Sequence, residues 1–442
     1  MKIELPEKVK QIITTIQAAG FEAYAVGGCV RDSLLGREPD DWDITTSAKP
    51  EQIKELFPRT IDTGIQHGTV TVMLQKEGFE VTTYRIDGTY EDSRHPKEVT
   101  FTANLTEDLK RRDFTINAMA YNETEGLIDI FDGKGDIERK LIRCVGEAKE
   151  RFKEDALRMM RAVRFSAQLG YGIEEKTKTA IKELAPTLKN ISAERIQTEL
   201  IKLVVSPNPD YLRIAYETGV TKVVLPEFDK MMETEQKNPH HCFNVGEHTL
   251  CAMKSIKADK VLRFAMLFHD IGKPDTLTVD EEGVYHFYGH PELGMEMTRK
   301  IMKRLKFDND TLHKVTKLVC CHDYDIVSTP KGMRRAIFKI GEDIMPMLFP
   351  VKQADLDAQS DYKKEEKQKK LDELTDIYKQ VLEEKDCVSL KTLAVTGSDL
   401  IAAGMKPGKE IGETLNRLLQ MVIDNPEYNT KEYLMEQAMK NN

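Results

Sequence analysis

The stretch that decides the fold is Gly27-Gly28-Cys29-Val30-Arg31-Asp32, which leads to Asp41-Trp42-Asp43 within 17 residues of its first glycine. The preceding Tyr24-Ala25-Val26 is apolar and predicts a short strand that ends in the two glycines. Glycine at the end of a strand lets backbone N–H groups approach a phosphate without interference from a side chain.

Asp41 and Asp43 form the second half of this pattern. Because alternate residues of a strand point to the same face, we expect both carboxylates to project side by side. Two carboxylates on one face suit Mg²⁺ that also holds substrate phosphates. A glycine turn followed by two solvated aspartates is the plainer interpretation, but the combination favours a nucleotidyl-transfer site.

Composition narrows the class of protein. The chain has 442 residues, of which 40% are hydrophobic, enough for two or three domains with proper cores. The net charge of −9 does not by itself indicate a nucleic-acid partner. The segment 139–205, however, carries 15 Lys and Arg against 9 Asp and Glu, so this region could meet a phosphate backbone. A solvated helical surface of mixed charge is the alternative.

The seven cysteines are odd in number and include no C-x-x-C pair. This argues against a disulfide framework or a thiolate zinc site, and for a reducing cytoplasm. No window approaches 18 apolar residues and the first residues include no apolar leader, so we expect a soluble, cytoplasmic protein without a membrane partner.

Local patterns divide the chain into a mixed and a helical part. Residues 1–20 predict a helix that stops at Gly20, and the β-branched runs Val70–Leu74 and Glu80–Tyr84 predict a hairpin with its turn at Lys76–Gly78. Arg85–Leu105 is polar and long, which is typical of a functional or mobile loop. From Ile137 onward the pattern is mostly helical, so the fold class is α+β. The charge-dense run Asp361–Lys370 predicts an exposed helix without chemistry.

A second motif runs from Arg111 to Met119 and begins Arg-Arg-Asp-Phe-Thr. The guanidinium groups of Arg111 and Arg112 can form paired hydrogen bonds to triphosphate oxygens, and Asp113 can accept a hydrogen bond from a ribose hydroxyl. The alternative is a helix cap, with Asp113 at a helix N-terminus.

A third motif, Glu154–Phe165, predicts a helix with Asp155, Arg158 and Arg161 on one face. An arginine can donate to the ring of cytosine or adenine, while an aspartate accepts from the exocyclic amine. Uracil and guanine present a carbonyl and an N–H at these places, so an Asp–Arg pair would select C and A. The alternative is a surface ion pair worth a few tenths of a kcal/mol.

In this order the motifs resemble those of the bacterial class II branch of the tRNA nucleotidyltransferase/poly(A) polymerase family, and Glu194–Leu200 is similar to the helix-stabilising motif that follows them there. The resemblance covers residues 21–205. It implies a polymerase-β-like nucleotidyltransferase head with a mixed sheet, followed by all-α neck, body, HD and tail regions. The ranges that follow are 1–138 for the head, 139–236 for the neck and body, 237–386 for the HD domain and 387–442 for the tail.

The resemblance also implies roles for the motif residues. Gly28 and Arg31 would contact the nucleotide phosphates, and Asp41 and Asp43 would be the catalytic ligands of two Mg²⁺ ions, with Glu80 a candidate third carboxylate. The predicted nucleotide-binding residues are Gly28, Arg31, Arg112, Asp113, Asp155, Arg158, Arg161 and Arg164.

A set of histidines predicts a second metal site. Eight of the ten histidines lie between residues 240 and 322, in an order that resembles the HD phosphohydrolase superfamily. Imidazoles combined with carboxylates favour Ni²⁺, Mn²⁺, Fe²⁺ or Zn²⁺. A lone histidine on an apolar face is usually a core residue, but a clustered set that contains His-Asp-Ile-Gly-Lys is less often so. The predicted ligands are His248, His269, Asp270, His290, His322 and Asp355, with His241 optional.

The function that the resemblance implies is template-free addition of CCA to the 3′ end of tRNA, with CTP and ATP as substrates and pyrophosphate as product. The tail, with turns at Gly397 and Gly404–Gly408, would contact tRNA phosphates, although plain helix caps are the alternative.

A poly(A) polymerase of the same family ranks lower, because Asp62–Val70 looks like the tRNA-specific branch and no basic tail follows. An enzyme that adds only the terminal A, with a separate partner adding CC, is a closer alternative. Family members that add only C tend to lack a full version of the loop Arg85–Leu105, so its presence favours addition of C and A. A metal-dependent phosphohydrolase whose head merely binds RNA is the rival from another class, ahead of a purely structural RNA-binding protein.

Overall fold

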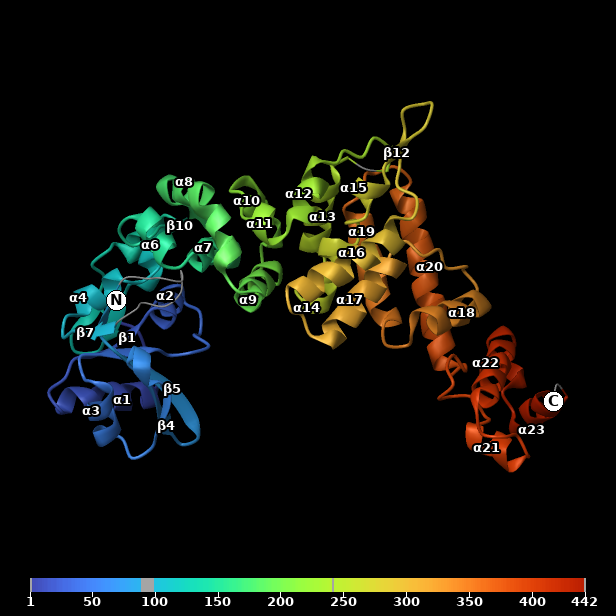
Figure 1. Ribbon diagram of the computed structural model, residues 1–442, viewed down its shortest axis with the longest axis horizontal. Helices are drawn as coiled ribbons and strands as arrows, with labels where there is room; N and C mark the ends of the chain where they lie inside the picture. The colour runs from blue at the N-terminus through green and yellow to red at the C-terminus, as the bar shows by residue number, and fades with distance from the viewer. Residues whose placement is uncertain (1, 89–98, 241, 441–442) are drawn as a thin grey trace. The chain divides into compact units, whose positions relative to one another are not determined.

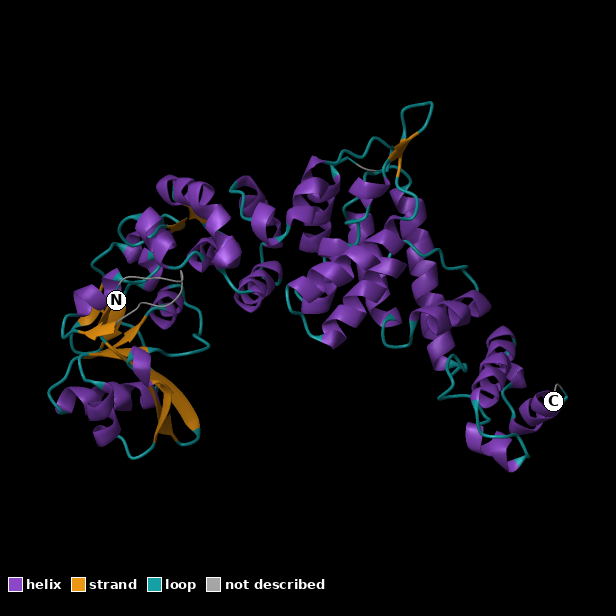
Figure 2. Cartoon of the chain, viewed as in Figure 1, coloured by secondary structure: helices purple, strands orange, loops and turns teal. Residues whose placement is uncertain are grey.

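The computed structural model describes residues 2–88, 99–240 and 242–440. They form two compact units, Met1–Pro226 and Glu227–Asn442. Figure 1 labels the elements of both units, and Figure 2 shows the strands gathered in the first unit while the second is mainly helical. The predicted α+β class is confirmed.

The elements of the first unit are α1 (Glu7–Ala18), β1 (Ala23–Val26), α2 (Gly28–Leu34), β2 (Ile44–Thr46), α3 (Pro50–Leu56), β3 (Thr60–Gly64), η1 (Ile65–His67), β4 (Thr69–Leu74), β5 (Glu77–Thr83), β6 (Arg85–Asp87), β7 (Val99–Phe101), α4 (Leu105–Lys110), η2 (Thr115–Asn117), β8 (Ala120–Asn122), β9 (Gly126–Ile128), α5 (Gly133–Glu138), β10 (Leu141–Ile142), α6 (Ala148–Glu154), α7 (Leu157–Leu169), β11 (Gly172–Ile173), α8 (Glu175–Leu184), η3 (Ala185–Asn190), α9 (Ala193–Val204), η4 (Pro209–Tyr211), α10 (Leu212–Glu217) and α11 (Thr221–Val224).

From the boundary onward follow α12 (Pro226–Glu233), α13 (Val245–Ser255), α14 (Lys260–Phe268), α15 (Lys273–Thr276), β12 (Thr278–Val279), β13 (Tyr285–His286), α16 (His290–Arg304), α17 (Asn309–Cys321), α18 (Pro330–Ile340), α19 (Met345–Asp357), α20 (Lys364–Glu383), α21 (Gly397–Ala402), α22 (Lys409–Asp424), η5 (Pro426–Tyr428) and α23 (Lys431–Met439).

A seven-stranded mixed sheet forms the centre of the first unit, in the order β3-β4-β5-β2-β1-β8-β9. Strands β2 and β5 are parallel, and the other neighbours are antiparallel. The predicted first helix is confirmed as α1, which begins at Glu7. Its apolar residues at helical spacing, among them Val9 and Ile16, are buried in one core cluster with the residues of β1 and β2.

Strands β4 and β5 confirm the predicted hairpin, but its turn lies one residue earlier than expected. The turn residues are Gln75 and Lys76, and both have a positive φ, 50° and 76°. A two-residue turn of this kind matches the twist of the antiparallel strands that it joins, so β5 already begins at Glu77.

The prediction that Asp41 and Asp43 lie within a strand is wrong, since β2 begins only at Ile44. The backbone of Asp43 is nevertheless already paired with β1, because its carbonyl accepts a hydrogen bond from the N–H of Val26 at 3.0 Å. The two carboxylates therefore stand at the entrance to a central strand, beside the glycine turn that ends β1.

The prediction of a loop over Arg85–Leu105 is correct only in part. Its two ends pair as the short antiparallel strands β6 and β7, and α4 begins at Leu105. Residues 89–98, with Ser93, Arg94, His95 and Pro96, lie outside the described residues.

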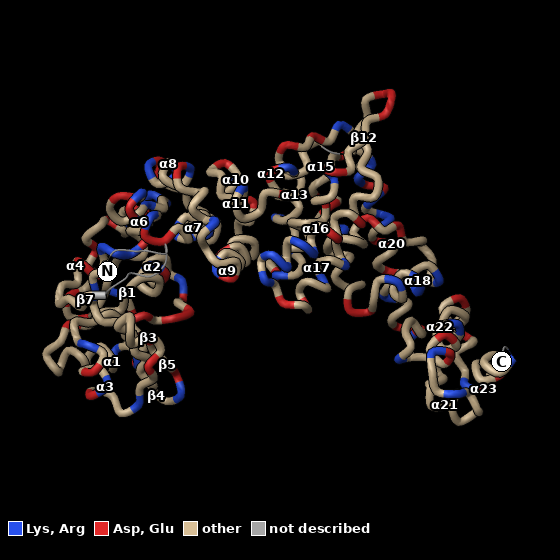
Figure 3. Tube along the Cα trace, viewed as in Figure 1, with Lys and Arg blue, Asp and Glu red and all other residues tan. Residues whose placement is uncertain are grey.

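The second unit is built from helices, together with the small hairpin β12–β13. The predicted helix over Asp361–Lys370 is confirmed from Lys364 onward as the start of α20, along which Figure 3 shows Lys and Arg interspersed with Asp and Glu. The prediction that this run is exposed and without a site is incomplete, because Lys367 lines the same cavity as Asp270. A separate core cluster, which runs from Cys387 to Ala438, unites α21, α22 and α23. In the parts of the chain that the structure describes, no helix combines the length and the apolar character needed to cross a bilayer.

Candidate active site and metal centre

The three motifs of the first unit meet at one cavity of about 560 Å³. The glycine turn that ends β1, the segment that follows α4, and the facing sides of α7 and α9 all contribute to its walls. Most of the charged residues that line it are arginines, a composition suited to a polyphosphate. The lining residues are Gly27, Gly28, Arg31, Asp43, Arg111, Arg112, Asp113, Asn117, Asp155, Leu157, Arg158, Arg161, Arg164, Phe165, Arg195 and Lys202.

The glycine turn brings the backbone close to a guanidinium group. Gly27 has a φ of +84°, and a Cβ there would lie 3.1 Å from Nη1 of Arg112, so the turn requires glycine for both conformation and space. Arg31 of α2 donates two hydrogen bonds to Asp32, and its Nη1 donates to Oδ1 of Asn117 at 2.7 Å. Arg31 and Arg112 are thus both held at the turn.

Three carboxylates lie near one another at the same end of the sheet. Strand β5 runs parallel to β2 with Ile44 opposite Val81, which places Glu80 alongside Asp43. Although Asp43 remains accessible to solvent, partial desolvation raises its pKa, with Arg112 opposing and Asp41 adding to the rise. Desolvation also raises the pKa of Glu80, and the charges of Asp43 and Asp41 add to it. This mutual repulsion is what a divalent cation bound by carboxylate oxygens would relieve.

Asp113 is buried and anchors the arginines of α7. Its carboxylate accepts hydrogen bonds from Nδ2 of Asn117 at 3.2 Å and from Nε of Arg161 at 2.8 Å. Burial opposes ionisation, but the charges of Arg161 and Arg158 outweigh it and lower the pKa of Asp113 to about 2. The alternative of a helix N-cap is wrong, because Asp113 follows the C-terminal end of α4.

The prediction of one continuous helix over Glu154–Phe165 is wrong. Helix α6 ends at Glu154, Asp155 has an extended backbone with φ −142° and ψ 103°, and α7 begins at Leu157. Oδ1 of Asp155 accepts a hydrogen bond from the N–H of Leu157 at 3.0 Å, so this carboxylate binds the first backbone N–H of α7. Arg158 forms an ion pair with Glu154 at 2.6 Å. Both predicted base-reading residues still line the cavity.

Helix α9 supplies partners that the motif analysis did not identify individually. Arg195 donates to Oδ2 of Asp155 at 2.6 Å, and Glu199 forms an ion pair with Arg164 at 2.6 Å. The guanidinium of Arg164 also lies over the ring of Phe165, 3.8 Å from its centroid. The Glu194–Leu200 motif was the signal for these contacts, since it carries both an arginine and a glutamate at helical spacing.

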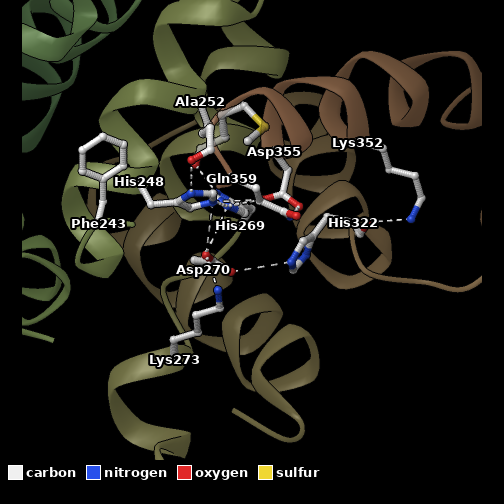
Figure 4. Close-up of polar contacts among 12 residues, drawn as sticks. Phe243, His248, Ala252, His269, Asp270, Lys273, His322, Lys352, Asp355 and Gln359 are labelled. Carbon is white, nitrogen blue, oxygen red and sulfur yellow. Dashed lines mark hydrogen bonds and ion pairs between the residues drawn. The ribbon is translucent and has the colours of Figure 1, made fainter. Parts of the chain in front are cut away.

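The second unit brings together all six predicted ligands of the HD site. His248 lies on α13, His269 and Asp270 follow α14, His290 begins α16, His322 follows α17, and Asp355 lies on α19. Figure 4 shows His248, His269, Asp270 and Asp355 pointing toward one another. Among the described residues, two groups have ligand atoms within 4.8 Å of one another, and they share Asp270. The groups are His248, His269 and Asp270, and Asp270, His290 and His322.

Each of the four imidazoles is oriented by a backbone carbonyl. Nδ1 lies 2.7 Å from the carbonyl of Met266 in His269 and 2.7 Å from that of Val319 in His322. The corresponding distances are 2.8 Å in His290 and 3.2 Å in His248. A carbonyl accepts, so Nδ1 carries the hydrogen and Nε2 points to the centre, as in histidines that bind metals.

The centre concentrates ligand atoms that repel one another unless a cation or a proton lies between them. Nε2 of His269 is 3.4 Å from Nε2 of His248, and Nε2 of His290 is 3.3 Å from Nε2 of His322. Burial opposes protonation of His269, but the carboxylates of Asp270 and Asp355 raise its pKa. The same carboxylates would attract a metal ion to this centre. The donor set fits a transition metal, and an aspartate shared by two groups fits a pair of them.

Two residues that were not among the predicted ligands contact the carboxylates of the HD site. Lys273, the lysine of the His-Asp-Ile-Gly-Lys stretch, forms an ion pair with Asp270 at 2.7 Å, and Gln359 donates to Asp355 at 2.9 Å. His241, the optional ligand, lies outside the described residues, whereas its neighbour His240 lines a cavity of about 580 Å³ that also reaches Asp270.

Comparison with known proteins identifies relatives that match this chain over nearly its whole length. Residues 23–143 match the family model of the poly A polymerase head domain, and residues 281–438 match that of a tRNA nucleotidyltransferase domain 2. The chain is 37% identical over 418 residues to a CCA-adding enzyme of Lactobacillus helveticus, covering 94% of this chain and 92% of that protein. It is 35% identical to one of Enterococcus faecalis, covering 99% and 97%.

A solved structure agrees with these relatives. The CCA-adding enzyme of Bacillus stearothermophilus in complex with CTP is 31% identical and superimposes with a TM-score of 0.71, over 98% of this chain and 97% of that one.

Proposed function

We propose, from the premise that this chain belongs to the CCA-adding enzyme family, that its first unit adds C, C and A in turn to the 3′ end of tRNA. CTP and ATP are the substrates and pyrophosphate is released. The observation that carries this proposal is the meeting of the glycine turn, Asp43 and the arginines of α7 at one cavity. A CCA-adding enzyme solved with CTP has the same fold over nearly the whole chain.

In the proposed reaction the 3′ hydroxyl of tRNA attacks the α-phosphate of the bound nucleotide. Asp41 and Asp43, with Glu80 beside them, are the residues that would hold Mg²⁺, which supplies charge neutralisation at the attacking and leaving oxygens. Arg31 and Arg112 bind the phosphates beside the glycine turn, where the backbone is close. Asp113, ionised at neutral pH, accepts from the ribose.

Base selection is assigned to Asp155 and Arg158. Asp155 accepts from the exocyclic amine of cytosine or adenine, and Arg158 donates to the ring. Because Asp155 is held by Arg195 and by the start of α7, its orientation is fixed before the nucleotide enters. No nucleic-acid template is needed if these two side chains supply the hydrogen-bonding pattern.

One assay tests this function. Three tRNAs, which end before CCA, after the first C and after CC, are each incubated with one labelled NTP at a time. We expect C on the first two substrates and A on the third, with no addition of U or G. Addition of A to the third substrate alone would identify an A-only enzyme, and long A tracts on unrelated RNAs would identify a poly(A) polymerase.

A second function is favoured by the convergence of four Nε2 atoms and two carboxylates in the other unit. We propose that this HD site binds one or two transition metal ions, of Ni²⁺, Mn²⁺, Fe²⁺ or Zn²⁺, and hydrolyses phosphate esters. Metal analysis of the purified protein, followed by hydrolysis assays with each metal added back, tests this activity independently of nucleotide addition.

The finer division of the chain is part of the same proposal. Residues 1–138 form the catalytic head, 139–236 select the base and bind RNA, 237–386 form the HD domain and 387–442 bind tRNA. The core cluster between Cys387 and Ala438 supports a separate tail. With tRNA as its substrate, the protein is assigned to the cytoplasm.

A further inference from the structure

An aromatic pair, His286 and Tyr288, lies beside the HD centre. Packing in the core does not account for the position of the Tyr288 ring, because most of this ring is exposed. The hairpin β12–β13 leads directly into Phe287 and Tyr288. The rings of His286 and Tyr288 are stacked, with centroids 5.4 Å apart and planes inclined by 7°. Tyr288 is 77% exposed, so its ring contributes little to the core and presents a flat face to solvent.

The pair is held in place by polar contacts of its own hairpin. Nε2 of His286 lies 2.7 Å from Oδ2 of Asp280, and the hydroxyl of Tyr288 lies 3.4 Å from Nδ1 of His286. The carboxylate of Asp280 also accepts from the N–H groups of Glu282 and Val284, which fixes the loop between the strands. A ligand that stacks on Tyr288 therefore meets a surface that is already ordered.

His286 and Tyr288 line the same cavity of about 580 Å³ as the metal ligands Asp270, His290 and Asp355. The volume is within the range of sites for molecules of nucleotide size. Phe287 connects the aromatic pair to the metal centre. It lies between His286 and Tyr288 in the chain, and its carbonyl accepts a hydrogen bond from Nδ1 of His290 at 2.8 Å.

Two lysines line this cavity close to the predicted metal ligands. Nζ of Lys273 is 2.7 Å from Oδ2 of Asp270, and Lys367 lines the same cavity, 2.5 Å from Oε1 of Gln359. The cavity thus offers a charged end, with metal ligands and lysines, and an aromatic end with a free ring face. A nucleoside phosphate has a charged phosphate at one end and a flat base at the other. Each of the nucleobases can stack on an aromatic ring.

We propose that Tyr288, supported by His286, is a stacking surface for the nucleobase, and that the HD site therefore prefers nucleoside phosphates to phosphate esters without a base. This rests on the proposed hydrolytic function of the HD site. In the hydrolysis the oxygen of water forms a new bond to phosphorus while the ester P–O bond breaks. The water loses one proton and the leaving oxygen gains one, which yields an alcohol and inorganic phosphate.

The test compares two substrates in the full-length protein, supplied with Mn²⁺ or Ni²⁺. Adenosine monophosphates carry a base and glycerol 2-phosphate does not. Tyr288→Ala should lower kcat/KM for the adenosine monophosphates by about fivefold to a hundredfold and leave glycerol 2-phosphate unchanged. Tyr288→Phe keeps the ring and should behave as the wild type. Phe338→Ala removes an exposed aromatic ring of α18 that does not line this cavity, and it is the matched control.

Binding of adenosine monophosphate, measured by calorimetry on the same variants, separates the two proposals. If the wild type hydrolyses neither substrate but loses affinity on Tyr288→Ala, the hydrolase is refuted and the stacking surface is upheld. If Tyr288→Ala changes neither binding nor the ratio of the two kcat/KM values, the stacking surface is refuted even where hydrolysis proceeds. An equal loss with both substrates would also refute it, because the ring would then act on the metal site and not on the base.

Discussion

Arg195 donates a hydrogen bond to Asp155 across 2.6 Å and so ties α9 to the junction between α6 and α7. Asp155 stands where the backbone leaves one helix and begins the next, a place where a side chain is otherwise poorly constrained. A carboxylate held by a guanidinium and by a helix N-terminus keeps a fixed direction. The base-reading role that we propose for Asp155 thus depends on a residue 40 positions further along the chain.

Loss of the Asp155 carboxylate should weaken base choice. In Asp155→Ala the acceptor for the exocyclic amine is absent, so we expect poorer use of CTP and ATP together and a smaller advantage over UTP and GTP. Each unsatisfied group is worth about 1–3 kcal/mol. Arg158→Ala should reduce the use of both correct nucleotides, because one guanidinium serves both. Kinetics with the four NTPs provide the measurement, and unchanged selectivity in Asp155→Ala would mean that the base is read elsewhere.

Arg195 should act as a positioning residue and not as a contact to the base. We expect Arg195→Ala to reduce selectivity in the same direction as Asp155→Ala but less, and Arg195→Lys to recover part of it, since a lysine keeps the charge but not the geometry. In the double variant Asp155→Ala/Arg195→Ala, the second change should add nothing further. Additive losses would show that Arg195 has a role of its own.

Asp41→Ala and Asp43→Ala should each lower the rate of nucleotide addition by at least about a hundredfold, while tRNA binding and the fold persist. The physical reason is that each removes a ligand whose charge matters most in the transition state. Asp40→Ala, which removes a neighbouring exposed carboxylate, is the control and should retain activity. Near-normal rates in both variants would exclude this site as the catalytic centre.

The HD site should be independent of nucleotide addition. His269→Ala or Asp270→Ala should abolish bound transition metal and any hydrolysis of phosphate esters, and spare CCA addition, because the ligands all lie in the second unit. His313→Ala removes an exposed imidazole from α17 and should change neither property. A folded His269→Ala protein that no longer adds nucleotides would contradict this independence.

Acid should remove the stabilisation that Asp113 provides. Its pKa is about 2 in the folded chain against an ordinary 3.8, so the unfolded chain binds the proton more tightly. The stabilisation is complete above about pH 4 and is lost as the pH falls toward 2, with a total of about 2 kcal/mol. Asp113→Asn should lower the free energy of unfolding at neutral pH and flatten its decline over this interval. Urea unfolding at pH 7, 4 and 3 measures it, and parallel declines in both proteins would contradict the assignment.

The sequence predicted the elements that depend on local pattern and missed what depends on contacts. Helix α1 and the β4–β5 hairpin follow from periodicity, and their ends shifted only by a few residues. The break at Asp155 has no such signal, because its neighbours are good helix formers and the break is held by Arg195, far along the chain. Asn117 was not identified as a site residue because its partner, Arg31, also lies far away along the chain.

That the six predicted HD ligands lie together could be expected from the sequence, because each carries a polar side chain that is rare in a core. Their pairing was not, since it depends on how α13, α14, α16, α17 and α19 pack together. Spacing along the chain gives no indication that Asp270 is common to both groups.

Three of the imidazoles receive their orientation from the carbonyl three residues earlier in their own segment, as His269 does from Met266. Each of these three predicted ligands is thus oriented by its own segment. The geometry of the site then depends on how the helices pack against one another. In the metal-bound site that we propose, affinity for the metal therefore depends on the tertiary packing of this unit. A variant that loosens the helices without touching a ligand would release its metal before it loses secondary structure, so metal release would give the earliest sign of unfolding.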